Sequence, residues 1–203
     1  MKKELIFVIS CMSGGGAERV VSLLSSNAVK RGYDVTLMIT GQTMSEAELF
    51  DVDKNVKVIS VPDLIRCNAK IRSDGIMLYA RAVGKLTKQS DKSRILKYKS
   101  RNYDKISFMH SFFKIHKNSA VVAFLYDSIF LSLLSVNKTN RLIISERGDP
   151  EQTTSETTKS FIKREFKNAD CFVFQSYGVE EWYKKNTPVR GTVIFNPVKS
   201  DLP

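Results

Sequence analysis

Three consecutive glycines near the N-terminus are the residues of this sequence best suited to bind an anion. Gly14, Gly15 and Gly16 follow an apolar run at 5–9 and precede a segment of helical periodicity at 17–30. Glycine lets the backbone approach an anion without interference from Cβ, and the first N–H groups of a helix point toward the same place. The arrangement predicts a phosphate-binding turn, although a tight turn that binds nothing fits the same residues.

Two known nucleotide-binding motifs can be tested against these residues. A dinucleotide fingerprint requires a glycine where Arg19 stands, and an acidic residue at the end of the second strand, which instead reads Ile39, Thr40, Gly41. A phosphate-binding Walker loop requires Lys and then Ser or Thr after the last glycine, where this chain has Ala and Glu. The sequence therefore disfavours both NAD binding and nucleotide hydrolysis.

Polar side chains follow three further apolar runs in the same way that the glycines follow the first. They are Asp127, Glu146, Arg147, Asp149 and Ser176. Because the carboxyl ends of parallel strands meet at one edge of a sheet, we expect these groups and the glycines to line one cleft.

The histidines and cysteines show no spacing typical of a metal site or a catalytic triad. His110 and His116 are six residues apart, which does not place them on one helix face, so structural roles are expected. Cys11, Cys67 and Cys171 are odd in number and widely separated, which is typical of reduced thiols in a cytosolic protein. No metal site is expected.

The elements that must position these groups alternate along the whole chain. The predicted strands are 5–9, 34–40, 56–61, 119–126, 141–145, 170–174 and 191–195, and the predicted helices are 17–30, 76–86, 106–115, 129–134, 154–168 and 179–185. Alternation of this kind predicts an α/β fold with an open, doubly wound parallel sheet and helices on both faces. The first run is apolar throughout, so it should be a central strand that is covered on both sides.

The charge of the chain is concentrated in one segment. Lys and Arg number 32 against 21 Asp and Glu, for a net charge of +11, and residues 63–118 hold fourteen of the basic but only four of the acidic residues. We expect residues 66–117 to contact an anionic membrane surface, joined by Phe108, Phe112 and Phe113 if these are exposed, although a merely solvated face fits the same charges. Nucleic acid is not the expected partner, because no reading motif interleaves with the basic residues. The chain has no run of about 18 apolar residues that could span a membrane.

Four segments resemble the N-terminal domain of GT-B glycosyltransferases of retaining family 4. They are 14–19 (GGGAER), 145–150 (SERGDP), 169–176 (ADCFVFQS) and 193–198 (VIFNPV), and together they span nearly the whole chain. The resemblance implies that residues 1–198 form a Rossmann-like, acceptor-binding domain and that 199–203 begin an interdomain linker. The nucleotide-sugar domain that follows in the family is expected to be absent from this chain.

The same resemblance implies a function. Members transfer a sugar from a nucleotide-diphosphate sugar to a saccharide or polyprenyl-linked acceptor in bacterial capsule, lipopolysaccharide O-antigen or other surface polysaccharide synthesis, without a cofactor or metal. The protein would be peripheral on the cytoplasmic face of the inner membrane, and this chain alone would be inactive. A non-catalytic Rossmann-like binding module and a basic nucleic-acid-binding domain remain as alternatives.

The resemblance also assigns roles to individual residues. Gly14, Gly15 and Gly16 would contact the donor diphosphate, and Asn196 and Pro197 would form the hinge. The acceptor would be bound by Arg19, Asp127, Glu146, Arg147, Asp149 and Ser176. Many family members carry a histidine where this chain has Ser145 and Glu146, so the group that contacts the acceptor hydroxyl stays open, with Glu146 and Asp127 as candidate catalytic residues.

Overall fold

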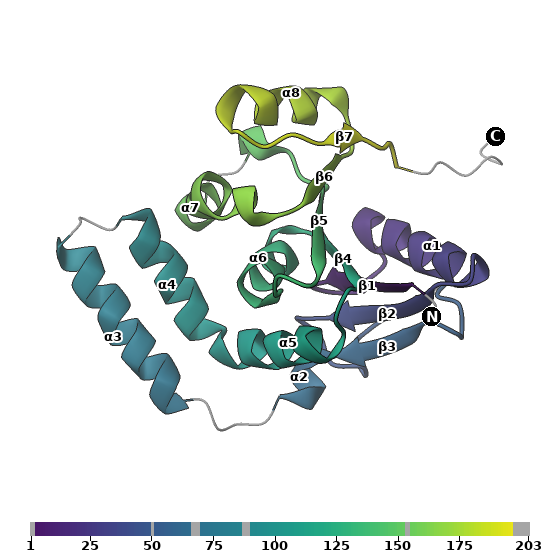
Figure 1. The fold of residues 1–203 in the computed structure, drawn as a ribbon, viewed down its shortest axis with the longest axis horizontal. Coiled ribbons are helices and arrows are strands. Elements are labelled where there is room, and N and C mark those ends of the chain that lie inside the picture. Colours follow the sequence, from purple (N-terminus) through teal and green to yellow (C-terminus); the bar gives the residue numbers. More distant parts are fainter. Residues whose placement is uncertain (1–2, 50, 66–69, 87–89, 153–154, 197–203) are drawn as a thin grey trace.

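The computed structural model describes residues 3–49, 51–65, 70–86, 90–152 and 155–196, and within them all seven strands form one parallel sheet. The strands are β1 (Glu4–Ile9), β2 (Asp34–Ile39), β3 (Lys57–Ser60), β4 (Ala120–Phe124), β5 (Arg141–Glu146), β6 (Cys171–Phe174) and β7 (Thr192–Val193). Their order in the sheet is β3-β2-β1-β4-β5-β6-β7 (Figure 1). The predicted doubly wound α/β fold is confirmed.

Helices cover both faces of this sheet (Figure 1). They are α1 (Gly16–Lys30), α2 (Val61–Leu64), α3 (Lys70–Leu86), α4 (Asp91–Arg101), α5 (Tyr103–Ile115), α6 (Tyr126–Ser135), α7 (Glu156–Arg164) and α8 (Tyr177–Asn186), with 3-10 turns at Pro150–Gln152 and Phe166–Asn168. None of the helices in the described part of the chain is both long and apolar enough to cross a membrane.

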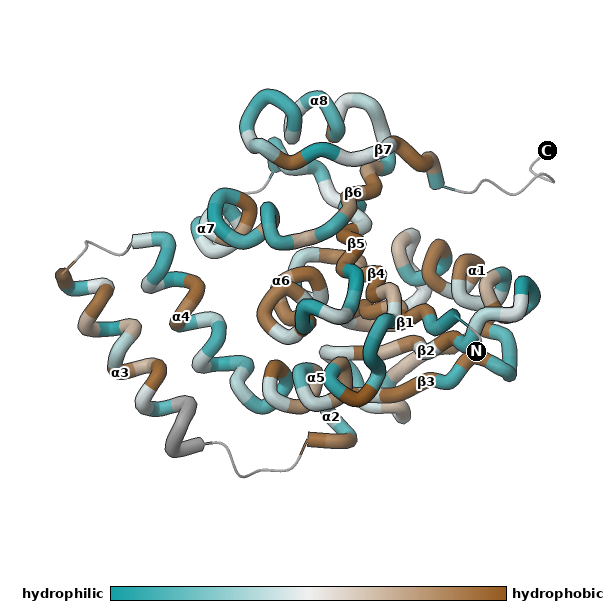
Figure 2. The backbone as a smooth tube through the Cα atoms, in the orientation of Figure 1, coloured by the Kyte–Doolittle hydropathy of each residue, from teal (hydrophilic) through white to brown (hydrophobic). Residues whose placement is uncertain are grey.

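β1 lies between β2 and β4 and is buried on both faces. Ile6 and Val8 belong to a core that includes residues of α5, α6 and α7, whereas Phe7 and Ile9 belong to a second core under α1. All four side chains are almost inaccessible to solvent, and the tube of the central strands is largely apolar (Figure 2). Two-sided burial explains why this run is apolar throughout.

α1 follows the predicted boundaries closely. Val20 and Val21 point into the second core, and the helix ends at Lys30 with Arg31 as its C-cap. Gly32 then adopts a left-handed conformation with φ of +83°, as predicted for the residue that follows the helix.

α4 is a helix that the sequence did not predict. Its mean hydropathy is low, and its apolar side chains are Ile95, Leu96 and Tyr98. The Ser90 hydroxyl caps its first turn by accepting the backbone N–H of Ser93 at 3.4 Å. α4 packs against α3 on one side and α7 on another, so tertiary contacts stabilise a segment whose own pattern is weak (Figure 1).

Several predicted boundaries were wrong, and the short helix α2 was not predicted. The helix after β4 begins at Tyr126 rather than 129, because Leu125 already leaves the strand with φ of +64°. The helix predicted over 154–168 divides into α7 and a 3-10 turn, and position 154 lies outside the described residues. The last strand is shorter than 191–195 and comprises Thr192 and Val193.

The aromatic residues of α5 do not form a free surface. Phe113 is fully buried, and Phe108 and Phe112 pack against the core. The Phe112 ring stacks on His116 at 4.1 Å between centroids, and His116 Nδ1 lies 2.5 Å from Glu4 Oε1. His110 Nδ1 contacts the Ser135 carbonyl at 3.0 Å, so both histidines join elements of the fold.

Candidate functional site at the carboxyl edge of the sheet

The sheet reverses its winding between β1 and β4. From β1 the chain proceeds to β2 on one side, and from β4 it proceeds to β5 on the other. In doubly wound sheets, ligands bind at the carboxyl ends of the strands beside such a switch point. Two turns flank it here, namely the glycine loop after β1 and the turn at Leu125 after β4.

The glycine loop is held in place by a side chain from the segment after β2. Gln42 Oε1 accepts the backbone N–H of Met12 at 2.7 Å, and its Nε2 donates to Ser13 Oγ at 2.8 Å. Gly14 requires the absence of a side chain because its φ is +82°. Gln42 lies between the predicted strands 34–40 and 56–61, and nothing in the local sequence shows that it reaches the loop after β1.

Glu18 lies against the backbone of the glycine loop, where the sequence predicts that a phosphate binds. A Cβ added to Gly15 would clash with Glu18 Oε2, and the Cys11 thiol donates to Oε1 at 3.4 Å. Burial, together with Glu18, raises the pKa of the Cys11 thiol. The carboxylate sits in the first turn of α1, where it interacts favourably with the helix dipole. An anion that approaches the loop therefore meets a carboxylate already beside Gly15.

The turn after β4 is strained and carries Asp127. Leu125 has φ of +64° and ψ of 145°, a conformation that costs a non-glycine residue on the order of 1–3 kcal/mol. Asp127 follows in the first turn of α6, and its Oδ1 accepts the Tyr98 hydroxyl at 2.5 Å. Burial and Asp127 raise the pKa of Tyr98. Asp127 is thus engaged by α4, and its predicted acceptor-binding or catalytic role stays a prediction.

Glu146 closes β5 and is 1% exposed. Its Oε1 accepts the Gly148 N–H at 2.8 Å, and its Oε2 accepts the Tyr183 hydroxyl at 3.1 Å. Tyr126 hydrogen bonds to the same carboxyl group. Burial raises the pKa of Glu146, and these donors oppose the rise. The buried Glu146 therefore connects the end of β5 to α8 and α6 through these hydrogen bonds. Its predicted catalytic role remains a prediction.

Arg147 is the half-buried cation of this edge. Its Nε donates to Ser145 Oγ at 3.0 Å, and a terminal nitrogen donates to Asn196 Oδ1 at 2.5 Å. The guanidinium carbon lies 5.6 Å from the centre of the Phe124 ring. Burial lowers the pKa of Arg147, and Glu146 counteracts this. The predicted hinge residue Asn196 is thereby joined to the carboxyl end of β5, whereas Pro197 lies outside the described residues.

The remaining predicted acceptor residues differ in their surroundings. Asp149 accepts the Glu151 N–H at 2.9 Å, and the Ser176 hydroxyl caps α8 by accepting the Val179 N–H at 3.3 Å. Arg19 is exposed, and among the described residues it forms no ion pair with Glu146.

The predicted site residues lie in three places at this edge of the sheet. Asp149 and Ser176 line one hollow beside the ends of β5 and β6, and Arg147 directly follows β5. The glycines lie at the end of β1, and Asp127 faces α4. Within the described part of the chain, no three His, Cys, Asp or Glu side chains are grouped closely enough to hold a metal ion.

Comparisons with known proteins give a likeness in fold. No protein-family model matches the sequence, and no characterised protein matches it by sequence. Among solved structures, the fold is similar to a chain titled sucrose-phosphate synthase from Thermosynechococcus elongatus, with a TM-score of 0.50 and 10% sequence identity, over 98% of this chain and 91% of that chain. The similarity supports a GT-B-like, Rossmann-like fold for this chain.

Proposed function

We propose that this chain is the acceptor-binding domain of a GT-B glycosyltransferase. The donor would be a nucleotide-diphosphate sugar, and the acceptor a lipid-linked saccharide. The observation that carries the proposal is the position of the glycine loop at the switch point of the sheet, with Arg147 and Asn196 joined at the same edge. The similar solved chain bears the name of an enzyme of sugar-phosphate synthesis, which agrees with this class of chemistry.

The arrangement suggests a division of tasks. Exposed backbone N–H groups of the glycine loop would bind the donor diphosphate and stabilise the charge that develops on it as it departs. Arg147 would contact the acceptor from β5, and Glu146 would keep Arg147 and Gly148 in place through its buried hydrogen bonds. Glu18 would have to turn away from Gly15 as the diphosphate enters.

Nucleotide-sugar titration of the isotope-labelled 203-residue chain tests the proposal. With UDP-, GDP- and dTDP-sugars, we expect weak, saturable chemical-shift changes at the amides of Gly14, Gly15 and Gly16 and no sugar turnover by the chain alone. In the control titration with a DNA duplex, the chemical shifts of these amides should not change. Shifts that avoid the glycine loop would contradict the proposal, and tight nucleotide binding without a partner domain would favour a non-catalytic binding module.

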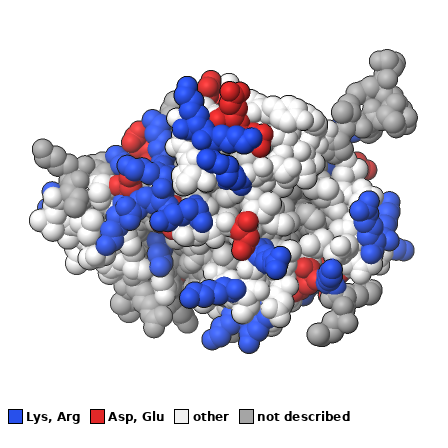
Figure 3. Space-filling model, turned by 45° about the horizontal axis from the view of Figure 1, so that its top comes forward, with Lys and Arg blue, Asp and Glu red and all other residues white. Residues whose placement is uncertain are grey.

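We also propose that the α3–α4 hairpin docks on an anionic membrane surface. α3 lies on the outside of α4 (Figure 1), and it carries Leu78 and Leu86, which are 69% and 85% exposed. The exposed basic residues described in the predicted surface are Arg81 and Lys85 on α3, Lys92 and Arg101 on α4, and Lys114 and Lys117 at and after the end of α5. Figure 3 shows Lys and Arg, with Asp and Glu among them, on the side of the molecule where α4 and α7 lie. Positions 66–69 and 87–89 of the predicted surface lie outside the described residues.

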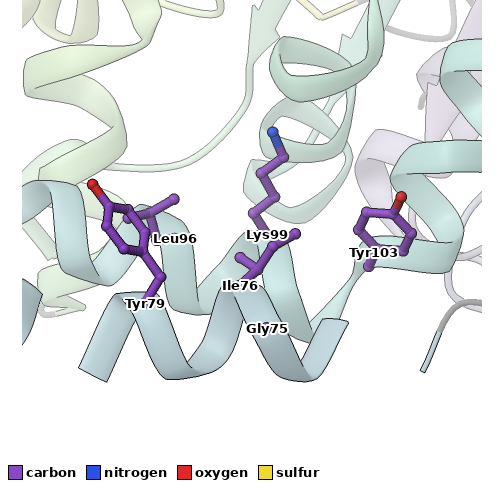
Figure 4. Close-up of a pocket in the computed structure, with 6 residues that line it drawn as sticks. All are labelled: Gly75, Ile76, Tyr79, Leu96, Lys99 and Tyr103. Carbon is purple, nitrogen blue, oxygen red and sulfur yellow. The ribbon is translucent and has the colours of Figure 1, made fainter. Parts of the chain in front are cut away.

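A groove between the two helices supports this docking. It has a volume of about 480 Å³ and is lined by Gly75, Ile76, Tyr79, Leu96, Lys99 and Tyr103. Lys99 stands between the two tyrosines, with its ammonium group beyond the apolar side chains (Figure 4). An acyl chain would fit the apolar wall while Lys99 contacts a lipid phosphate.

Vesicle sedimentation tests the docking. The chain should bind phosphatidylcholine vesicles that contain phosphatidylglycerol, and high salt should weaken this binding because the attraction is screened. Leu78→Ser and Leu86→Ser together should release the protein, whereas Leu23→Ser, an equally simple change on exposed α1, should not. Binding to DNA but not to these vesicles would contradict the docking and favour a nucleic-acid partner.

A further inference from the structure

Trp182, the single tryptophan of the chain, lines three adjoining hollows beside the carboxyl edge. Their volumes are about 330, 510 and 270 Å³, which is the scale of small-molecule sites. Trp182 is half-buried on α8 and meets Tyr183 edge-on, with ring centroids 5.1 Å apart at 75°. A neighbouring ring therefore holds the indole in place while its remaining surface stays open.

The three hollows form one continuous groove. The first and third share Pro150, the first and second share Asn186, and the second and third share Glu151 and Gly178. The third is also lined by Asp149 and Ser176, the predicted acceptor residues at the ends of β5 and β6. The groove thus begins at the proposed acceptor edge and continues outward past Trp182.

The walls of the groove differ in chemistry. The first hollow has an apolar wall that includes Ile162 and Pro188, whereas the other two include carboxylates in their lining, namely Asp149, Glu151 and Glu181. A pyranose ring presents an apolar C–H face that packs on an indole, and a rim of hydroxyl groups that donate to carboxylates and amides. An aromatic face with acceptors at its edges is complementary to both parts of such a ring.

The charges around the groove favour an uncharged ligand. Lys159 and Lys163 line the first hollow, but they form ion pairs with Glu156 at 3.0 Å and Asp91 at 3.3 Å. The lining of the second and third hollows includes three carboxylates but one cation, Lys185. A nucleotide, a nucleic acid or an acidic sugar would meet net repulsion there.

From these observations we infer that Trp182 is the stacking platform of a subsite for a neutral oligosaccharide. The inference rests on the proposed function in one respect, because it takes this oligosaccharide to be the part of the acceptor farther from the reacting hydroxyl. Specificity for the acceptor would then reside partly in α8, outside the segments on which the family resemblance depends.

Intrinsic fluorescence tests the subsite directly, because Trp182 is the sole tryptophan. The 203-residue chain is titrated with maltotriose, cellotriose, mannotriose and chitotriose, and with UDP as a charged control. We expect a saturable change in emission with at least one trisaccharide, at millimolar affinity, and none with UDP. If no trisaccharide changes the emission, or if UDP alone does, the inference is overturned.

A blocking variant provides the second measurement. Gly178 lines two hollows, and a Cβ added there meets no atom within 4 Å, so Gly178→Phe should fill the groove without disturbing the fold. We expect it to abolish the response to the trisaccharide, whereas Leu24→Phe on exposed α1 leaves the response intact. An unchanged affinity in Gly178→Phe would overturn the inference.

The readout separates this inference from the proposed function. In one outcome, Gly178→Phe removes saccharide binding, and nucleotide sugars cause no chemical-shift change in the glycine loop. This outcome would overturn the proposed function and leave the subsite established. The reverse result, with nucleotide sugars at the glycine loop and no response at Trp182, would overturn the subsite alone.

Discussion

The Tyr98 hydroxyl on α4 donates a 2.5 Å hydrogen bond to the Asp127 carboxylate in the first turn of α6. The same hydroxyl lies 3.2 Å from the Asp127 carbonyl, and the Tyr98 ring meets Phe130 and Phe161 edge-on at 5.6 and 5.3 Å. One side chain thus joins the α3–α4 hairpin both to the apolar core and to the turn beside the switch point.

Tyr98→Phe should lower the free energy of unfolding by about 1.5–3 kcal/mol, the usual contribution of a hydrogen bond to a charged group. The aromatic contacts with Phe130 and Phe161 are kept, so the loss reports on the hydroxyl. Urea denaturation measures the change. Tyr79→Phe, on an exposed ring of α3, should cost less than about 0.5 kcal/mol. Equal stabilities for the two variants would show that the bond to Asp127 contributes nothing.

Glu146 should make stability depend on pH in a specific direction. Its pKa is raised by burial, so its contribution is fully present below the unfolded pKa of about 4.3 and is lost as the pH rises through the higher folded pKa. Glu146→Gln cannot titrate. The free energy of unfolding of the variant relative to the parent should therefore increase with pH across this window. Denaturation series at several pH values measure this difference, and a relative stability independent of pH would refute the expectation.

Gln42→Ala should loosen the glycine loop while leaving the sheet intact. The variant loses the acceptor of the Met12 N–H and the donor to Ser13, each contributing about 0.5–1.5 kcal/mol. We expect faster hydrogen exchange at the Met12 amide and unchanged exchange within β1. Gln152→Ala, which removes a comparable bond to Asp149, serves as the matched control. Equally slow hydrogen exchange at the Met12 amide in both variants would show that Gln42 does not hold the glycine loop in place.

Glu18→Gln should make Cys11 more reactive. Part of the rise in the thiol pKa comes from the negative charge of Glu18, so removing that charge lowers the pKa and increases the thiolate fraction at pH 8. Alkylation by iodoacetamide, followed by peptide mass spectrometry, measures the rate at Cys11. The exposed Cys171 in the same sample is the internal control, and its rate should not change. An unchanged rate at Cys11 would show that burial alone governs this thiol.

The sheet could be predicted because its signals are local. A strand covered on both faces must be apolar at every position, as in Ile6 to Ile9, and polar or glycine residues must follow where the chain turns at the edge. The position of the glycine loop at the end of β1 follows from the same reasoning.

The missed features depend on partners far away in the sequence. α4 has a weak pattern of its own, and its packing through Tyr98 involves residues of α6 and α7. Gln42 reaches Met12, and Tyr183 reaches Glu146, across intervals that no motif spans. Glu146 and Asp127 were predicted to bind the acceptor or to act in catalysis, and their bonds to Tyr183 and Tyr98 were not predicted. A carboxylate at a strand end has the same sequence pattern whether it faces a cleft or a buried tyrosine.

The order of the sheet also constrains the order in which the protein can assemble. Leu5 pairs with Val35 of β2 and with Ala120 of β4, so one side of β1 finds its partner early in synthesis and the other side much later. During translation, β1, α1 and β2 can associate first, while the side of β1 that receives β4 stays open. Closure of that side requires a long-range parallel pairing, which is intrinsically slow. The nascent chain therefore exposes an apolar strand edge until β4 is synthesised. Chaperone binding or misassembly would occur during this interval.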